Sequence, residues 1–241
     1  MGKVVVEIPN SLEDVSLEDY LSFMTFDSND EELITLKAFE CFLKLDKEYA
    51  YGLPLREAEE LFKAVKNAVE DNGKAQRLYE VNGKTFGRIP NLDNITLGEY
   101  VDLDKYAEFD KEGKPNFKMA LNFMSVLYRP VKDRAGNIYN IEEYESGLKN
   151  HEYIKQLPAS AFVGSLVFFC DLRRELLNAT KNSIHRAEIL LQSASSSGKN
   201  TGGMQASITS LKATLADLMK LPQPQFTRPL RFCLTKLSKA G

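Results

Sequence analysis

The chain has 241 residues, and its 31 Lys and Arg stand against 34 Asp and Glu, which gives a net charge of −3. Apolar residues make up 43% and charged residues 27%, a composition that excludes a wholly disordered chain and allows one large or two small globular domains. The longest apolar stretch, residues 159–170, is about half of the ~20 residues that a membrane-spanning helix needs, so we expect no membrane partner.

Cysteine usage indicates a reducing compartment. Cys41, Cys170 and Cys233 form no CxxC pair, and their odd number argues against a disulfide framework. Each lies among apolar neighbours, so we expect buried, reduced thiols. Residues 1–10 lack a basic segment followed by an apolar core, and we therefore expect no secretory signal and synthesis in the cytoplasm.

Residues 1–76 are predicted to form an N-terminal helical part. Residues 4–8 suggest a short strand before it. The sequence S-L-E-D at residues 16–19 has the capping pattern that opens a helix. Apolar residues at helical spacing predict a longer helix over residues 34–49, and a further helix opens at Pro54.

Residues 77–177 are predicted to add a β-hairpin and more helices to the same body. The dipeptide N-G at residues 82–83 lies between β-compatible runs, which is the strongest short hairpin signal because both residues tolerate positive φ. A second capping pattern, T-L-G-E, occupies residues 96–99. Apolar side chains on all faces of residues 117–128 predict a core helix that Pro130 stops.

The next elements lead into a predicted helical hairpin. A turn or small hairpin is expected at residues 133–139, and Pro158 opens the strongest helix of the chain, which extends to Leu176. Residues 178–221 form the helical hairpin, since apolar residues repeat at 3-4-3 spacing on both sides of a Ser- and Gly-rich loop. Each seam is too short for a coiled coil alone, so the two arms must pack on each other or on a partner. The candidate seam consists of Ile184, Leu191, Ile208, Leu211, Leu215 and Leu218.

Residues 222–241 are predicted to form an extended basic C-terminal arm, because three prolines interrupt regular structure there. The arm could be a solvated tail, a binder of single-stranded nucleic acid through alternating basic and aromatic residues, or an arm that docks on a neighbouring subunit. We favour docking, since four basic residues are few for a nucleic-acid binder. The candidate assembly contacts are Phe226, Arg228, Leu230, Arg231, Phe232, Leu234, Lys236 and Lys239.

The near-neutral total charge hides an uneven distribution. From Asn178 onward nine Lys and Arg oppose two acids, a net +7, so the first 177 residues carry −10. This division predicts a basic end that meets an acidic surface on another copy, another protein or nucleic acid. The whole sequence predicts a mainly α fold with a small β-hairpin: a compact helical body, a C-terminal helical hairpin and an extended basic tail.

No arrangement of chemistry-bearing residues predicts a reaction. His151 and His185 are the only histidines, no Cys/His spacing matches a zinc site, and the sequence has no G-x-S-x-G elbow or Gly-rich phosphate loop. The acids at residues 142–143, or at 102 and 104, could supply paired carboxylates, but acids on solvated segments are usually only solvated. We expect a protein that is not an enzyme, with no catalytic residue, cofactor or metal.

Four phrases in the middle of the chain carry a family resemblance. They are YEVNGKTF at residues 79–86, ITLGEYVDLDKY at 95–106, MSVLYRPV at 124–131 and YNIE at 139–142. Together they resemble a group of small structural proteins of tailed bacteriophages, including the crAss-like phages of gut Bacteroidota. The resemblance covers about residues 12–177, and the basic region after it departs from the pattern.

The resemblance implies a virion structural protein made in the cytoplasm of the host bacterium. Such a protein would form a ring or decoration at the portal, neck or tail barrel, as a head–tail connector does, through contacts with its own copies and with portal or tail ring proteins. Two alternatives stay open: a tail assembly chaperone that is absent from the mature particle, and a packaged head protein that contacts DNA. Nucleic acid is possible as a partner but is not favoured.

Overall fold

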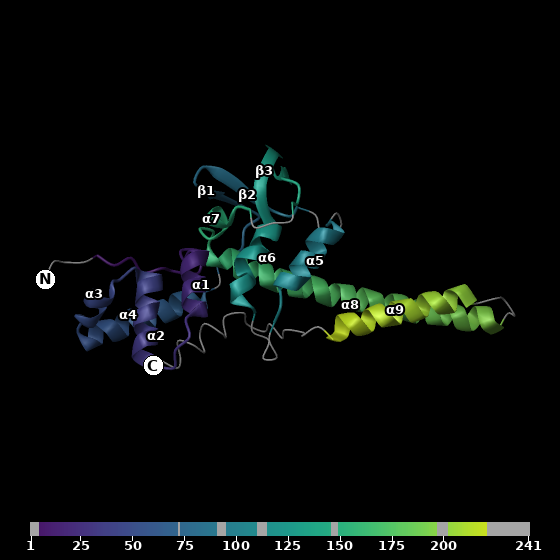
Figure 1. The fold of residues 1–241 in the computed structure, drawn as a ribbon, viewed down its shortest axis with the longest axis horizontal. Helices are drawn as coiled ribbons and strands as arrows, with labels where there is room; N and C mark the ends of the chain where they lie inside the picture. Colours follow the sequence, from purple (N-terminus) through teal and green to yellow (C-terminus); the bar gives the residue numbers. More distant parts are fainter. Residues whose placement is uncertain are drawn as a thin grey trace. The chain divides into compact units, whose positions relative to one another are not determined.

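The structure, a computed structural model, is mainly α with a small antiparallel sheet, as the sequence predicts (Figure 1). It describes residues 5–71, 73–90, 95–109, 115–145, 149–196 and 202–220. The described chain divides into two compact units. Unit 1 comprises its residues up to Glu108 and Pro115–Leu166, and unit 2 comprises Phe109 and the residues from Val167 onward.

Four helices open unit 1: α1 (Leu17–Thr25), α2 (Glu31–Leu43), α3 (Lys47–Tyr51) and α4 (Leu55–Glu70). The predicted cap of α1 is confirmed, because the Ser16 side chain accepts a 3.1 Å hydrogen bond from the backbone N–H of Asp19. Two expectations in this region are wrong. Residues 5–8 form no strand, and the helix predicted over residues 34–49 is split into α2 and α3.

The split follows from an unusual helix end at Lys44. This residue adopts the left-handed conformation with φ 54°, which normally favours glycine, and α2 ends there. The next residue, Leu45, is buried, and its N–H donates to the carbonyl of Phe39 at 3.2 Å. Lys44 also forms an ion pair with Asp19 of α1. These packing and charge contacts stabilise a helix end that periodicity alone does not reveal.

The sheet consists of β1 (Leu78–Val81), β2 (Lys84–Arg88), β3 (Tyr128–Ala135) and β4 (Ile138–Ile141), in the order β1-β2-β3-β4 with all pairs antiparallel. The predicted N-G hairpin is confirmed: Asn82 and Gly83 have φ 48° and 73° and connect β1 to β2. The turn predicted near residue 136 is also confirmed and joins β3 to β4. Pairing of β2 with β3 unites the two hairpins into one sheet.

One tyrosine connects β4 with β2. The ring of Tyr139 lies so close to Gly87 that a Cβ on this glycine would be 2.6 Å from the Tyr139 Cε2 atom. The Tyr139 hydroxyl donates a 2.6 Å hydrogen bond to the carbonyl of Arg88. Because Gly87 has no side chain, the Tyr139 ring can lie directly against the backbone of β2.

The helix predicted over residues 117–128 is shorter than expected. The chain forms a 3-10 turn, η2 (Phe117–Met119), and then α6 (Ala120–Leu127), while Tyr128 already begins β3. Pro130 disfavours the helical conformation of the residue before it, Arg129, and both residues pair with β2 instead. Before this segment lies α5 (Leu97–Tyr106), and α7 (His151–Ile154) follows the sheet.

An aromatic cluster fills the core of unit 1. The ring of Phe162 lies 6.3–6.5 Å, between ring centroids, from Tyr20 of α1, Phe117 of η2 and Phe123 of α6. Phe162, Tyr20 and Phe123 are each at most 2% exposed. These rings come from α1, η2, α6 and the helix that carries Phe162. Burial of Phe162 therefore stabilises the packing of the N-terminal helix α1 against α6.

The longest helix, α8 (Ala159–Ser196), begins after Pro158 as predicted and continues for 38 residues. The predicted boundary after residue 177 therefore falls inside a continuous helix, whereas the described units divide after Leu166. A last helix, α9 (Gly202–Lys220), follows. Within the described residues, no helix combines the length and apolar character that crossing a bilayer requires.

Candidate functional site

The first candidate site is the helical hairpin of unit 2, where α9 lies beside the C-terminal half of α8 (Figure 1). Lys212 of α9 forms a 2.6 Å ion pair with Glu188 of α8. Beyond residue 177, the only buried side chains among those described are Ile184 and Ile208. Among the described side chains, the apolar core of the seam therefore consists of these two isoleucines.

Four positions of the predicted seam have described side chains. Ile184 and Ile208 are 6% and 5% exposed, and Leu191 and Leu211 are half-buried. The side chains of Leu215 and Leu218 lie outside the described residues, as does all of the predicted arm at residues 222–241. The eight assembly contacts proposed in that arm therefore remain predictions.

Apolar side chains also occupy positions of this hairpin outside its seam. Ile189 and Leu190 of α8 are 53% and 58% exposed, and Met204 of α9 is 38% exposed. On a helix, positions 189 and 190 lie roughly 140° and 240° from Ile184, so they point away from the seam. Exposed apolar side chains beside a small core are typical of a helix surface that packs against a partner.

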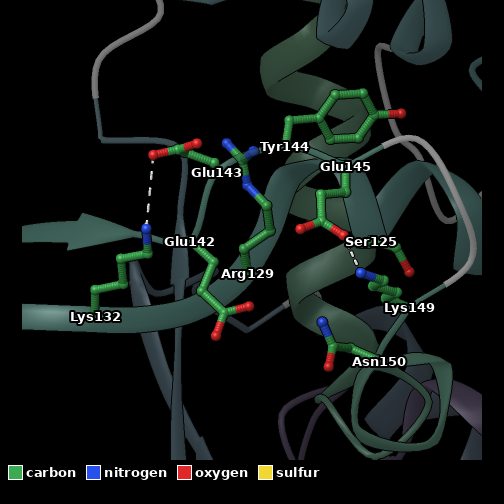
Figure 2. Close-up of a pocket in the computed structure, with 9 residues that line it drawn as sticks. All are labelled: Ser125, Arg129, Lys132, Glu142, Glu143, Tyr144, Glu145, Lys149 and Asn150. Carbon is green, nitrogen blue, oxygen red and sulfur yellow. Dashed lines mark hydrogen bonds and ion pairs between the residues drawn. The ribbon is translucent and has the colours of Figure 1, made fainter.

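The second candidate site is a polar pocket of about 300 Å³ in unit 1 (Figure 2). Its wall is formed by the end of α6, by β3 and by the chain that follows β4. The lining side chains carry charges of both signs, and they are Ser125, Arg129, Lys132, Glu142, Glu143, Tyr144, Glu145, Lys149 and Asn150.

One lining residue of this pocket, Arg129, belongs to a buried ion pair. Arg129 of β3 contacts Glu99 of α5, and the two side chains are 10% and 5% exposed. Glu99 also completes the predicted capping box, because its Oε2 atom accepts a 2.7 Å hydrogen bond from the Thr96 N–H. The guanidinium carbon of Arg129 lies 5.7 Å from the centre of the Tyr144 ring. One arginine thus joins the sheet, α5 and the segment after β4.

Tyr144 extends the network. Its hydroxyl donates a hydrogen bond to Asp102, and burial together with this carboxylate raises the pKa of Tyr144 above its usual value. Asp102 was one half of a possible catalytic carboxylate pair with Asp104. In the structure Asp102 has a structural partner instead, while the Oδ1 atom of Asp104 is buried without a hydrogen-bond partner.

Two further ion pairs lie at the surface of the pocket. Lys132 lies 3.8 Å from Glu143, and Lys149 pairs with Glu145 (Figure 2). Acids 142–143, the other possible carboxylate pair, line this pocket without forming an isolated acidic site. Across the residues that the structure describes, no group of three or more His, Cys, Asp or Glu could hold a metal ion. The pocket is thus a network of paired charges that joins chain segments.

Sequence reasoning missed the Arg129–Glu99 pair because the two residues are 30 positions apart. The one signal was a single arginine inside the apolar run at residues 117–131, since a buried charge needs a partner. Comparison of the chain with protein-family models, with curated proteins and with solved structures finds no match in any of the three.

Proposed function

We propose that this protein is a non-enzymatic structural component of a tailed-phage virion, which forms a ring or decoration at the portal, neck or tail barrel. Two independent features support the proposal. The first is the resemblance of residues 79–142 to small phage structural proteins. The second, which carries most weight, is the set of apolar side chains that the hairpin of unit 2 leaves exposed.

The core that the described side chains of the hairpin form is small relative to the length of its helices. Burial of one isoleucine contributes about 1.5–3 kcal/mol, whereas ordering the backbone costs about 1–2 kcal/mol per residue. Only Ile184 and Ile208 are buried among the described side chains after residue 177, and Ile189, Leu190 and Met204 are exposed. A second layer of helices would bury these side chains, so the hairpin fits a protein that completes its packing in an assembly.

A ring is the assembly that fits the charge distribution best. A chain with an acidic first part and a basic last part offers two different, complementary surfaces. Contact between two different surfaces is heterologous, and repeated heterologous contacts close into a ring when the rotation between neighbours permits. The partners would be further copies of this chain and a portal or tail ring protein.

The test is mass spectrometry of purified particles of the phage that encodes the chain. We expect its peptides in the particles at a constant ratio to the major structural proteins, after washing at high salt, with an abundant host cytoplasmic protein as the contamination control. Absence from particles, with a soluble complex in infected cells, would contradict the proposal and favour an assembly chaperone. If the chain leaves the particles together with the genome when they are emptied, this would favour a DNA-contacting head protein.

A further inference from the structure

An exposed apolar surface lies at the N-terminal end of α2, at α3 and at the start of α4. Leu33, Tyr49, Tyr51 and Leu55 are 39%, 51%, 54% and 76% exposed. The last three residues lie within seven positions of one another, and the neighbouring Glu32 carboxylate at the start of α2 raises the pKa of Tyr51. We call these four residues the acceptor surface.

Acidic residues outnumber basic ones in the segment that carries the acceptor surface. Residues 27–71 contain 12 Asp and Glu against six Lys and Arg. Glu57, Glu59 and Glu60 are exposed on the first turns of α4, where Glu60 forms an ion pair with Arg56. Lys47 lies 5.6 Å from the centre of the Tyr51 ring, so a cation already occupies one face of this aromatic side chain. The surface therefore combines aromatic faces, which attract cations, with a net negative charge.

We propose that the acceptor surface binds residues 222–241 of a second copy of this chain. This inference rests on the proposed function, since it identifies the contact between neighbouring subunits. Residues 222–241 contain four Lys and Arg and no acid. Arg228 and Arg231 are three positions apart, with Leu230 and Phe232 beside them, so basic and apolar side chains alternate at short intervals. This pattern complements a surface of exposed Tyr and Leu among carboxylates.

Length and stiffness also suit the segment for this role. Twenty residues reach up to about 66 Å when extended, which is enough to cross from one small domain to the next. The three prolines restrict the unbound chain and so reduce the entropy that is lost on binding. The acidic surroundings disfavour nucleic acid as an occupant, because phosphates would be repelled there.

The proposal can be tested with two charge-reversal variants of the full chain. The acceptor variant carries Glu57→Lys, Glu59→Lys and Glu60→Lys, and the arm variant carries Arg228→Glu and Arg231→Glu. Light scattering after size exclusion measures the mass of each. We expect each variant alone to associate at least ~tenfold more weakly than the unchanged chain, because like charges then meet in the contact. A one-to-one mixture of the two should regain association.

A matched control carries Glu80→Lys, an exposed position on β1 away from the acceptor surface, and should keep the mass of the unchanged chain. A second acceptor variant, Leu55→Asp, tests the apolar part at a position that is 76% exposed and therefore dispensable for folding. It should weaken association as the charge reversal does, with unchanged circular dichroism.

Three results would overturn the proposal. One is a monomer for the unchanged chain at all concentrations. Another is a mass that neither charge variant alters. The third is a mixture that does not regain association, while a single chain that carries both sets of reversals does. That pattern would mean that residues 222–241 dock on their own chain. Each result leaves the particle measurement unaffected, so failure of this contact and failure of the proposed virion role are separable.

Discussion

Unit 1 and the hairpin of unit 2 are stabilised in different ways. In unit 1, large aromatic side chains from helices and sheet are almost fully buried, among them Tyr20, Tyr128, Phe86 and Phe162. In the hairpin beyond residue 177, two isoleucines are buried among the described side chains and one cross-helix ion pair, Lys212–Glu188, supports them. The first region has the core of an independent domain, whereas the described side chains of the second form a small core and leave apolar positions exposed.

Because of this difference, we expect folding stability and assembly to depend on different residues. Substitutions in unit 1 should change the free energy of unfolding at any protein concentration. Substitutions in the hairpin should have effects that depend on concentration, because association with a partner stabilises only the folded hairpin. The following variants test this separation.

The largest expected effect is that of Phe162→Ala. Truncation of a fully buried phenylalanine costs about 3–5 kcal/mol, and here it also removes ring contacts with Tyr20, Phe117 and Phe123. Urea denaturation followed by circular dichroism measures the loss. Leu190→Ala, at an exposed position of α8, is the control and should change the unfolding free energy of a dilute sample by less than ~0.5 kcal/mol. Equal losses of unfolding free energy for the two variants would contradict the difference between unit 1 and the hairpin.

The next effect concerns the buried ion pair. Arg129→Met should cost about 3 kcal/mol, because it leaves the Glu99 carboxylate buried without its cation. The double variant Arg129→Met, Glu99→Gln should be more stable than the single variant, since the amide is neutral and can still accept from the Thr96 N–H. A double-mutant cycle by denaturation measures the coupling. A double variant that is less stable than Arg129→Met would show that the loss of stability does not come from the unpaired Glu99 carboxylate.

A smaller and more local effect is expected for Ile208→Ala in the hairpin. Loss of one of two buried seam residues should cost about 2 kcal/mol, the lower end for such truncations, because the neighbouring positions are half-buried. Amide hydrogen exchange should accelerate in α9 and remain unchanged in β1–β4. The acceleration should diminish as protein concentration rises. Uniform acceleration throughout the chain would mean that the hairpin and unit 1 unfold together.

The smallest effect is a pH dependence from His151. Burial lowers the pKa of His151 below its usual 6.5, and its buried Nε2 atom has no hydrogen-bond partner. The folded state therefore binds fewer protons than the unfolded state, so stability is complete above pH 6.5 and declines as pH falls below it. Denaturation midpoints at pH 7.5 and 5.5 should differ less in His151→Asn than in the unchanged chain. An equal difference between the two midpoints in His151→Asn and in the unchanged chain would exclude His151 as the source of the pH dependence.

Local patterns in the sequence predicted the fold where local chemistry determines it. Ser16 and Thr96 cap helices because a side-chain oxygen and a backbone N–H three residues later suffice. The N-G turn at residues 82–83 needs only two residues with positive φ. By contrast, α2 ends at Lys44 in a left-handed conformation that this residue type does not predict, and an ion pair joins Lys44 to Asp19 of another helix.

The sites were predictable only in part for the same reason. Helical spacing placed Ile184 and Ile208 on one seam, since periodicity reports the face of a helix. Tyr128 continued an apolar helical pattern, yet it belongs to a strand because β2 offers backbone partners at that point. The charge network at Arg129 depends on the meeting of α5 and β3, which no local pattern encodes.

The contact between Gly87 and Tyr139 has an evolutionary consequence. A Cβ at position 87 would overlap the Tyr139 ring, so the two positions cannot vary independently. Among related sequences, any residue larger than glycine at 87 should occur with a small side chain at 139, and the hydrogen bond to the Arg88 carbonyl should be lost with it. Coupled change at these positions would thus mark relatives that retain the four-stranded sheet even when little else in the sequence is shared.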